Sequence, residues 1–155
     1  MKKIFLLFAP IIICLSATDA GAQTGTLLKA KQEIVLITAV KTKGKDLIID
    51  ADFVQMLTGK AAVDAAKKTG EAEYDINKKK DTVWYVPNDF FILNSNPAIR
   101  QLQISPAAQI FLIKTGGSTL VKSSMPKLKN NFMGKLFRIT LRQNEITKLE
   151  EIYTP

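Results

Sequence analysis

The sequence contains no histidine, and its only cysteine, Cys14, lies within the first 22 residues. Histidine is the usual general base near neutral pH and the commonest transition-metal ligand. Its absence excludes a Ser-His-Asp or Cys-His catalytic apparatus. A zinc site needs histidine or cysteine ligands and a disulfide needs two cysteines, so neither is expected. The residue types therefore favour a non-enzymatic protein that uses no metal or other cofactor.

Long apolar runs are scarce as well. The run at residues 4–15 follows two lysines and is about a dozen residues long, shorter than the roughly 20 of a membrane-spanning helix. Small residues ending in Ala20-Gly21-Ala22 come next. This order of charged, apolar and small residues is typical of a secretory signal peptide. We therefore expect residues 1–22 to be cleaved and the protein to be exported, either to the periplasm or as a secreted protein.

Acidic residues are outnumbered by basic ones. The chain has 22 Lys and Arg against 14 Asp and Glu, and losing Lys2, Lys3 and Asp19 with the signal leaves 20 against 13, a net charge of +7. This excess favours anionic partners such as nucleic acid, acidic glycans or lipid headgroups, and it also serves solubility. We expect an unidentified partner in the envelope or outside the cell, and an anionic molecule is a candidate for it. After cleavage of the signal, no stable membrane insertion is expected.

The rest of the chain has the size and apolar content of one domain. Residues 23–31 are small and polar and are expected to form a flexible leader. Residues 32–155 are expected to form a single globular, β-rich domain.

Two segments predict β-hairpins. The first joins strands at residues 33–40 and 46–53 through a basic turn that contains Gly44. The second joins residues 137–142, where apolar and polar residues alternate, to residues 145–153. Both pairs are expected to be antiparallel.

Two segments predict helices. Residues 58–69 are rich in alanine, with Thr58 placed to cap the N-terminus and Gly70 to provide a left-handed stop. A shorter helix is expected to begin near Ser124, because Pro126 suits a first helical turn.

The middle of the chain predicts strands separated by prolines. Residues 71–81 are polar and charged and are expected to form a mobile loop. Pro87 and Pro106 interrupt the apolar segments that follow, because proline cannot donate a hydrogen bond to a sheet. Two short strands or one bulged strand are expected within residues 82–93, and single strands at residues 100–104 and 108–114.

These elements define an α+β fold that is mainly β. About six short strands, one alanine-rich helix and one shorter helix predict a small curved antiparallel sheet or a partly open barrel. The oligonucleotide/oligosaccharide-binding fold is the leading example of such a barrel. A flatter sheet with its helices on one face is the alternative.

Aromatic and basic side chains supply the candidate ligand-binding residues. Trp84, Tyr85 and Phe90 could form a surface on which a base or a sugar ring stacks. Arg100 and Arg142, on other strands, could hold a phosphate or carboxylate at its edge. The same aromatic residues would also suit the core of a β domain, and the sequence leaves both interpretations open.

Carboxylates provide the alternative chemistry. Asp50, Asp52 and Asp64 could offer oxygens to calcium, but no EF-hand loop surrounds them, so no metal site is predicted. Asp50, Asp52 and Asp89 border apolar segments and are the candidates for a carboxylate-dependent hydrolase. Such chemistry requires two carboxylates that converge across a cleft.

Several segments resemble a family of small exported bacterial proteins of unknown function. They are Asp50-x-Asp52-Phe53 with Leu57-Thr58-Gly59, then Pro87-Asn88-Asp89-Phe90-Phe91 with Asn94-x-Asn96-Pro97, and the C-terminal Tyr153-Thr154-Pro155. The resemblance covers most of the chain after the signal and implies no catalytic residue. It implies that the Asn-Asp-aromatic segment, the Asn-x-Asn-Pro turn and the C-terminal tail form one structural unit.

Three functions are consistent with the sequence. The first is an exported binding or interaction module without catalytic activity. The second is an electrostatic binder of polyanions that uses Lys41, Lys43, Lys45 and residues 78–80, and its signature would be a steep salt dependence. The third is the carboxylate-dependent hydrolase.

The signal peptide leads to a first prediction. When the full-length chain is expressed in a bacterium with a secretion system, the exported product should begin at Gln23. Intact-mass measurement of that product checks this, and an N-terminus that retains residues 4–15 would contradict it.

Overall fold

The computed structural model describes residues 29–154, so the predicted signal peptide and most of the predicted leader lie outside the described residues. Five long strands form the main body, and we call them the barrel strands. They are β1 (Lys31–Lys43), β2 (Asp46–Thr58), β6 (Ile99–Ile113), β8 (Leu136–Arg142) and β9 (Glu145–Ile152).

These five strands pair in a closed ring. β1 pairs antiparallel with β2 and with β8, and β9 pairs antiparallel with β8. β6 pairs antiparallel with β2 and parallel with β9, which closes the ring. In chain order the strands therefore run first, second, third, fifth and fourth around the barrel, as in the oligonucleotide/oligosaccharide-binding fold. The prediction of a mainly β, barrel-like α+β fold is confirmed.

Register shifts give the strands the curvature that closure requires. β1 shifts against β2 between Ile37 and Ala39, and the extra residue, Thr38, donates a hydrogen bond from its hydroxyl to the Asp50 carbonyl at 3.2 Å. β6 shifts against β9 between Ile104 and Gln109. Such bulges bend a strand and increase its twist.

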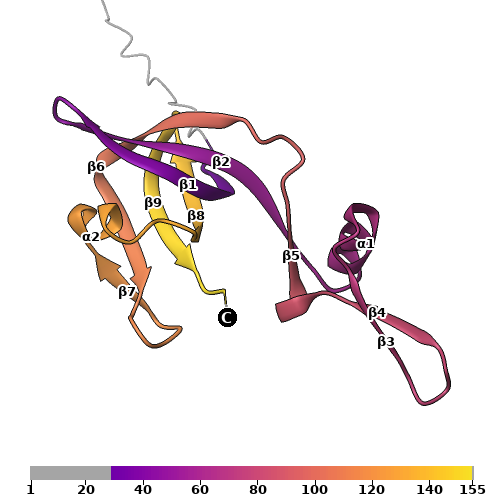
Figure 1. Cartoon of the computed structure of the whole chain (residues 1–155). Helices are drawn as coiled ribbons and strands as arrows, with labels where there is room; N and C mark the ends of the chain where they lie inside the picture. The colour runs from indigo at the N-terminus through magenta and orange to yellow at the C-terminus, as the bar shows by residue number, and fades with distance from the viewer. Residues whose placement is uncertain (1–28, 155) are drawn as a thin grey trace, which may run out of the picture.

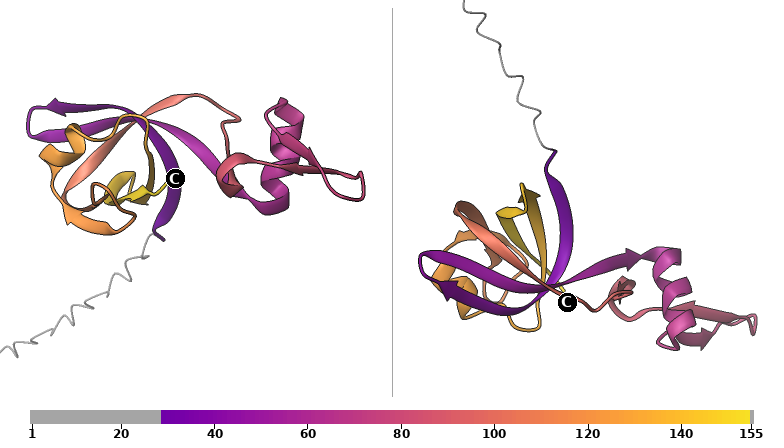
Figure 2. Two further views of the ribbon diagram at one scale, coloured as in Figure 1. Left: turned by 60° about the horizontal axis from the view of Figure 1, so that its bottom comes forward. Right: turned by 90° about the horizontal axis from the view of Figure 1, so that it is seen from above.

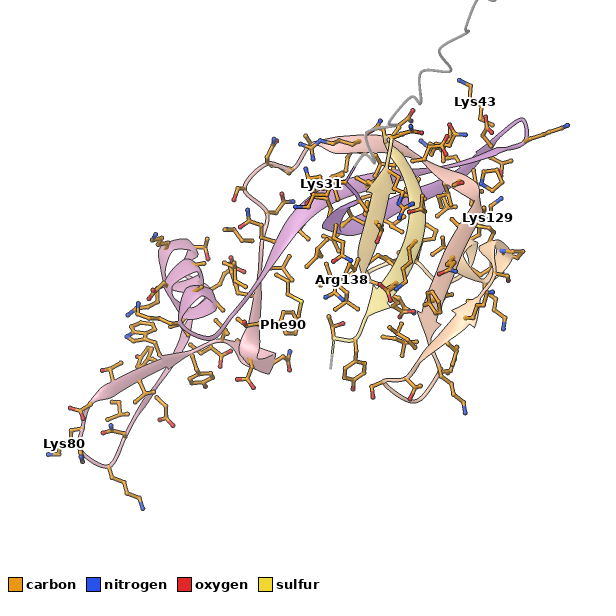
Figure 3. The ribbon with its side chains drawn as sticks, turned by 180° about the vertical axis from the view of Figure 1, so that it is seen from behind. Lys31, Lys43, Lys80, Phe90, Lys129 and Arg138 are labelled. Carbon is orange, nitrogen blue, oxygen red and sulfur yellow. The ribbon has the colours of Figure 1, made fainter. Side chains whose placement is uncertain are left out.

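The interior of the barrel is filled by alternate side chains of every strand. These are aliphatic except for the fully buried Phe137. The helix α2 (Met125–Lys129) adds the fully buried Leu128, and Lys129 Nζ donates to Thr42 Oγ1 at 2.6 Å. α2 and β7 (Leu120–Ser123) lie on the side of the barrel away from Lys31 (Figure 3). The buried set comprises Val35, Ile37, Ile49, Ala51, Leu102, Ile104, Ile110, Leu112, Leu128, Phe137, Ile139, Ile146 and Leu149.

A second lobe projects from the side of the barrel (Figures 1 and 2). We call it the extension, residues 59–93. It comprises the helix α1 (Gly59–Thr69), the hairpin of β3 (Glu73–Ile76) and β4 (Thr82–Tyr85), the short turn η1 (Pro87–Asp89) and β5 (Phe90–Leu93). β2 runs beyond the barrel to reach it, and β5 pairs with that outer part of β2.

The extension has a small hydrophobic core of its own. Ala62 and Ala66 of α1 are fully buried against Val86, and Leu57 and Phe91 pack around them. The predicted helix is thus confirmed, and Gly70 ends it with a φ of 78°. Thr58 occupies the N-cap position, but its side chain makes no capping hydrogen bond.

Two local predictions were wrong. β6 passes through Pro106 without a break because its pairing with β2 ends at Ile104 and its pairing with β9 resumes at Gln109. Residues 71–81, predicted as a loop, contain β3, which forms by pairing with β4. Leu120 and Val121 lie in the strand β7, which pairs with the edge of β6 just before the predicted short helix.

A buried carboxylate connects the barrel to the segment that returns from the extension. Asp52 is only 7% exposed, and its Oδ2 accepts a hydrogen bond of 2.6 Å from Asn94 Nδ2. Its Oδ1 has no hydrogen-bond partner among the described residues. The contact brings together the Asp-x-Asp-Phe and Asn-x-Asn-Pro segments, two of the motifs quoted for the family resemblance.

This contact predicts a specific loss of stability. Asn94→Ala leaves a buried carboxylate without its side-chain donor, which should lower the free energy of unfolding by about 2 kcal/mol. Urea unfolding measures the change. Asn96→Ala, two residues away on the exposed turn, is the control and should change stability by less than about 0.5 kcal/mol. Equal losses in the two variants would contradict this assignment.

Candidate functional site

One end of the barrel contains a cleft with a volume of about 630 Å³. We call this the mouth cleft. Its floor is apolar and its rim carries three cations and one carboxylate. It is lined by Lys29, Lys31, Glu33, Phe53, Arg100, Leu102, Leu141, Gln143 and Asn144.

Arg100 is held in place at this rim. Its guanidinium carbon lies 4.6 Å from the centroid of the Phe53 ring, a stacked arrangement that limits the motion of the side chain. No carboxylate in residues 29–154 forms an ion pair with it. Lys31, in contrast, is paired with Glu33 at 2.5 Å. Arg100 is therefore an oriented cation whose donors are available to a ligand.

A second cleft of about 350 Å³ runs along the outer surface of β2 and β6. We call it the amide cleft, because four of its residues carry side-chain amides. Gln143 and Asn144 line both clefts, so the two form one continuous surface. The lining residues of the amide cleft are Ile48, Gln101, Gln103, Gln143, Asn144 and Glu145.

The two shared residues form the turn between β8 and β9. Both have positive φ, 49° at Gln143 and 68° at Asn144. Tight two-residue hairpin turns of this type favour Asn, Asp or Gly at both positions, so Gln143 is an unusual occupant. Its left-handed conformation places an amide side chain between the two clefts.

A polar network across three strands orients one amide of the amide cleft. Lys41 of β1 donates to the Asp50 carboxylate of β2, and Gln101 Nε2 of β6 donates to the same carboxylate at 3.1 Å. The hydrogen bond from Lys41 is the main reason that the pKa of Asp50 lies below its ordinary value of 3.8. Asp50 is therefore ionised near neutral pH. An ionised carboxylate can accept hydrogen bonds but has no proton to give as a general acid.

The structure divides the five residues predicted to bind a ligand between its two lobes. Trp84 and Tyr85 lie on β4 and Phe90 begins β5, so all three belong to the extension. Arg100 and Arg142 lie on the barrel strands β6 and β8. Among them, Arg100 alone lines the mouth cleft, while Arg142 is exposed opposite Glu145.

The other predicted groups are also separated. Lys43 and Lys80 lie at opposite ends of the molecule, at the tips of two different hairpins (Figure 3). Asp52 is bound to Asn94, Asp50 is bound to Lys41, and Asp89 lies in η1 of the extension. Residues 29–154 contain no group of three or more His, Cys, Asp or Glu arranged to hold a metal ion.

Several cleft residues were not identified from the sequence. Phe53 and the amides of Gln101, Gln103, Gln143 and Asn144 are adjacent only after the barrel closes. The alternation Arg100, Gln101, Leu102, Gln103, Ile104 contained the relevant signal, because it places both glutamines on the outer face of one strand.

A comparison with models of known protein families finds no matching family, and searches of curated proteins and of solved structures find no match either. In the described part of the chain, no helix has the length and apolar character needed to cross a membrane.

The polar network predicts a measurable titration. The Asp50 carboxyl should titrate below 3.8, and Lys41→Gln should move its pKa upward, because the main stabilising hydrogen bond to the charged form is lost. A folded-state pKa below the unfolded value means that this contribution to stability is present above the unfolded pKa and disappears as the pH falls. Carboxyl NMR titration checks the shift, and an unchanged pKa in the variant would contradict it.

Proposed function

We propose that this protein is an exported binding module that holds an acidic oligosaccharide at the mouth of its barrel. The observation that supports this most directly is Arg100, which is stacked on Phe53 at the rim of the mouth cleft without a carboxylate partner.

Arg100 suits a carboxylate or sulfate on the ligand. A guanidinium presents its donors in a planar fork that matches such groups with two hydrogen bonds. Contact with the Phe53 ring restricts the guanidinium before the ligand arrives, which lowers the entropy lost on binding. Lys29 at the same rim adds a second positive charge.

The continuous surface beyond Arg100 suits a ligand whose other polar groups are mainly hydroxyls. Each side-chain amide can donate and accept at once, as a hydroxyl also can. Gln143 and Asn144 connect the mouth cleft to the amide cleft, where Gln101 is already oriented by Asp50. A chain of several sugar units would extend from Arg100 across the turn towards Gln103.

Single-stranded nucleic acid suits this surface less well. Binding of successive bases depends on exposed aromatic rings. Phe53 is the one aromatic residue that lines either cleft, and its ring is already covered by Arg100.

Calorimetric titration with defined oligosaccharides tests this function. A tetramer of galacturonic acid should bind at least tenfold more tightly than the neutral tetramer of galactose. Arg100→Ala should weaken binding of the acidic tetramer by about tenfold to a hundredfold, the range expected for a charged hydrogen-bonding pair. Arg100→Lys should restore only part of the loss, because lysine lacks the planar fork.

The matched control is Lys122→Ala on β7, which removes one positive charge away from the mouth cleft. It should change the affinity by less than about twofold. Equal losses in the Arg100 and Lys122 variants, with a steep dependence on salt and tighter binding of oligothymidylate, would favour the polyanion binder instead.

A further inference from the structure

The β3–β4 hairpin exposes an unusual number of large apolar side chains. Tyr74 and Ile76 are each 61% exposed, and Trp84 is 38% exposed. Scattered apolar residues on a surface are ordinary, but a contiguous exposed group marks a contact site. These three residues come from two paired strands, so they form one surface.

The two faces of this hairpin differ in chemistry. Tyr74 pairs directly with Trp84 across the strands, and their ring centroids are 5.1 Å apart. Ile76 lies two residues further along β3 and therefore shares their face. We call this the apolar face of the hairpin. The opposite face combines the acidic residues Glu73 and Asp75 with the exposed Val83 and Tyr85, and a hydrogen bond with Glu73 is the main cause that raises the pKa of Tyr85.

Lysines surround the apolar face. Lys67 of α1 places its ammonium 4.6 Å from the centre of the Trp84 ring, and Lys68 follows it on the helix. Three more lysines, Lys78, Lys79 and Lys80, form the tip of the hairpin, which Figure 3 shows at the far end of the extension. Lys67 thus lies at the apolar face, and the three tip lysines outnumber the one carboxylate beside them, Asp81.

Four backbone amides of the tip are paired within the tip. Asn77 N donates to the Asp81 carbonyl at 3.0 Å, and Lys80 N donates to the Asn77 carbonyl at 2.9 Å. The Asn77 side-chain oxygen accepts from the Lys79 and Asp81 amides at 2.9 and 3.0 Å. Pairing most of the backbone donors of a loop internally lowers the cost of approaching an apolar environment.

We propose that the β3–β4 hairpin docks onto the surface of an anionic lipid bilayer, with its apolar face in the headgroup region. Tryptophan and tyrosine favour this interface because their rings are apolar and their tips are polar. Clustered lysines are attracted to anionic headgroups over the same short range. Docking is peripheral, and the extension projects away from the barrel (Figures 1 and 2).

The chemistry of Trp84 favours a bilayer over single-stranded nucleic acid. Its ring already contacts the Lys67 ammonium over one face and the ring of Tyr74. A base that stacked on the face next to Lys67 would have to displace the ammonium. Insertion among lipid headgroups requires no such displacement.

Trp84 also provides the measurement, because it is the only tryptophan in the chain. The experiment uses the chain from Gln23 onward, because the apolar run at residues 4–15 would itself bind lipid. This shorter chain contains every residue of both hydrophobic cores. Vesicles of phosphatidylcholine with phosphatidylglycerol should shift the Trp84 fluorescence to shorter wavelength, and brominated lipid should quench it. Vesicles of phosphatidylcholine alone should do neither.

Two variants separate the charge from the apolar contact. Replacing Lys78, Lys79 and Lys80 together by glutamine should weaken vesicle binding by about a hundredfold, because each lysine near the surface contributes severalfold. Ile76→Ser should reduce the spectral shift and the quenching. Circular dichroism confirms that each variant keeps its fold.

The matched control replaces Lys43, Lys45 and Lys122 by glutamine, the same change in charge away from the hairpin, and should weaken binding by less than about threefold. Equal losses in the two triple variants would overturn the proposal. Vesicle binding without any change in Trp84 fluorescence would also overturn it. So would quenching of Trp84 by oligothymidylate without a response to vesicles.

Discussion

Closure of the barrel by β6 is the interaction on which the rest of the structure depends. This strand pairs with β2 on one side and with β9, in parallel, on the other. Without it, the hairpins β1–β2 and β8–β9 would form an open sheet joined only through β1 and β8. The closed ring buries one continuous core and brings Arg100 next to Phe53 and next to the Gln143–Asn144 turn. The mouth cleft is therefore a product of closure and not of any single segment.

The extension depends on β2 and β6. β2 runs beyond the ring to carry α1 and to pair with β5, and the chain returns to the barrel as β6. Asp52 and Asn94 connect these outgoing and returning segments at the edge of the barrel. The molecule thus has two surfaces of different chemistry. One is a cleft that combines an oriented cation with amides, and the other is a hairpin that combines aromatic and aliphatic groups with lysines.

Local signals in the sequence predicted those parts of the fold that local physics determines. The hairpins around Gly44 and around Gln143–Asn144 were predicted from alternation and turn residues, and α1 from its alanines and Gly70. The parallel pairing of β6 with β9 was not predicted, because no short-range pattern records it. Of the candidate site, Arg100 was identified. Trp84, Tyr85 and Phe90 were expected beside it but lie in the extension, since a contiguous aromatic segment does not specify which lobe carries it.

The most direct test of this account is to map ligand contacts at the level of single residues. Backbone amide NMR spectra of the chain from Gln23 onward would be recorded during titration with the galacturonic acid tetramer. The account predicts that chemical-shift changes cluster at residues 29–33, at Phe53, at residues 100–103 and at residues 141–145. Changes confined to the β3–β4 hairpin, or spread evenly over exposed lysines, would contradict a ligand site at the mouth of the barrel.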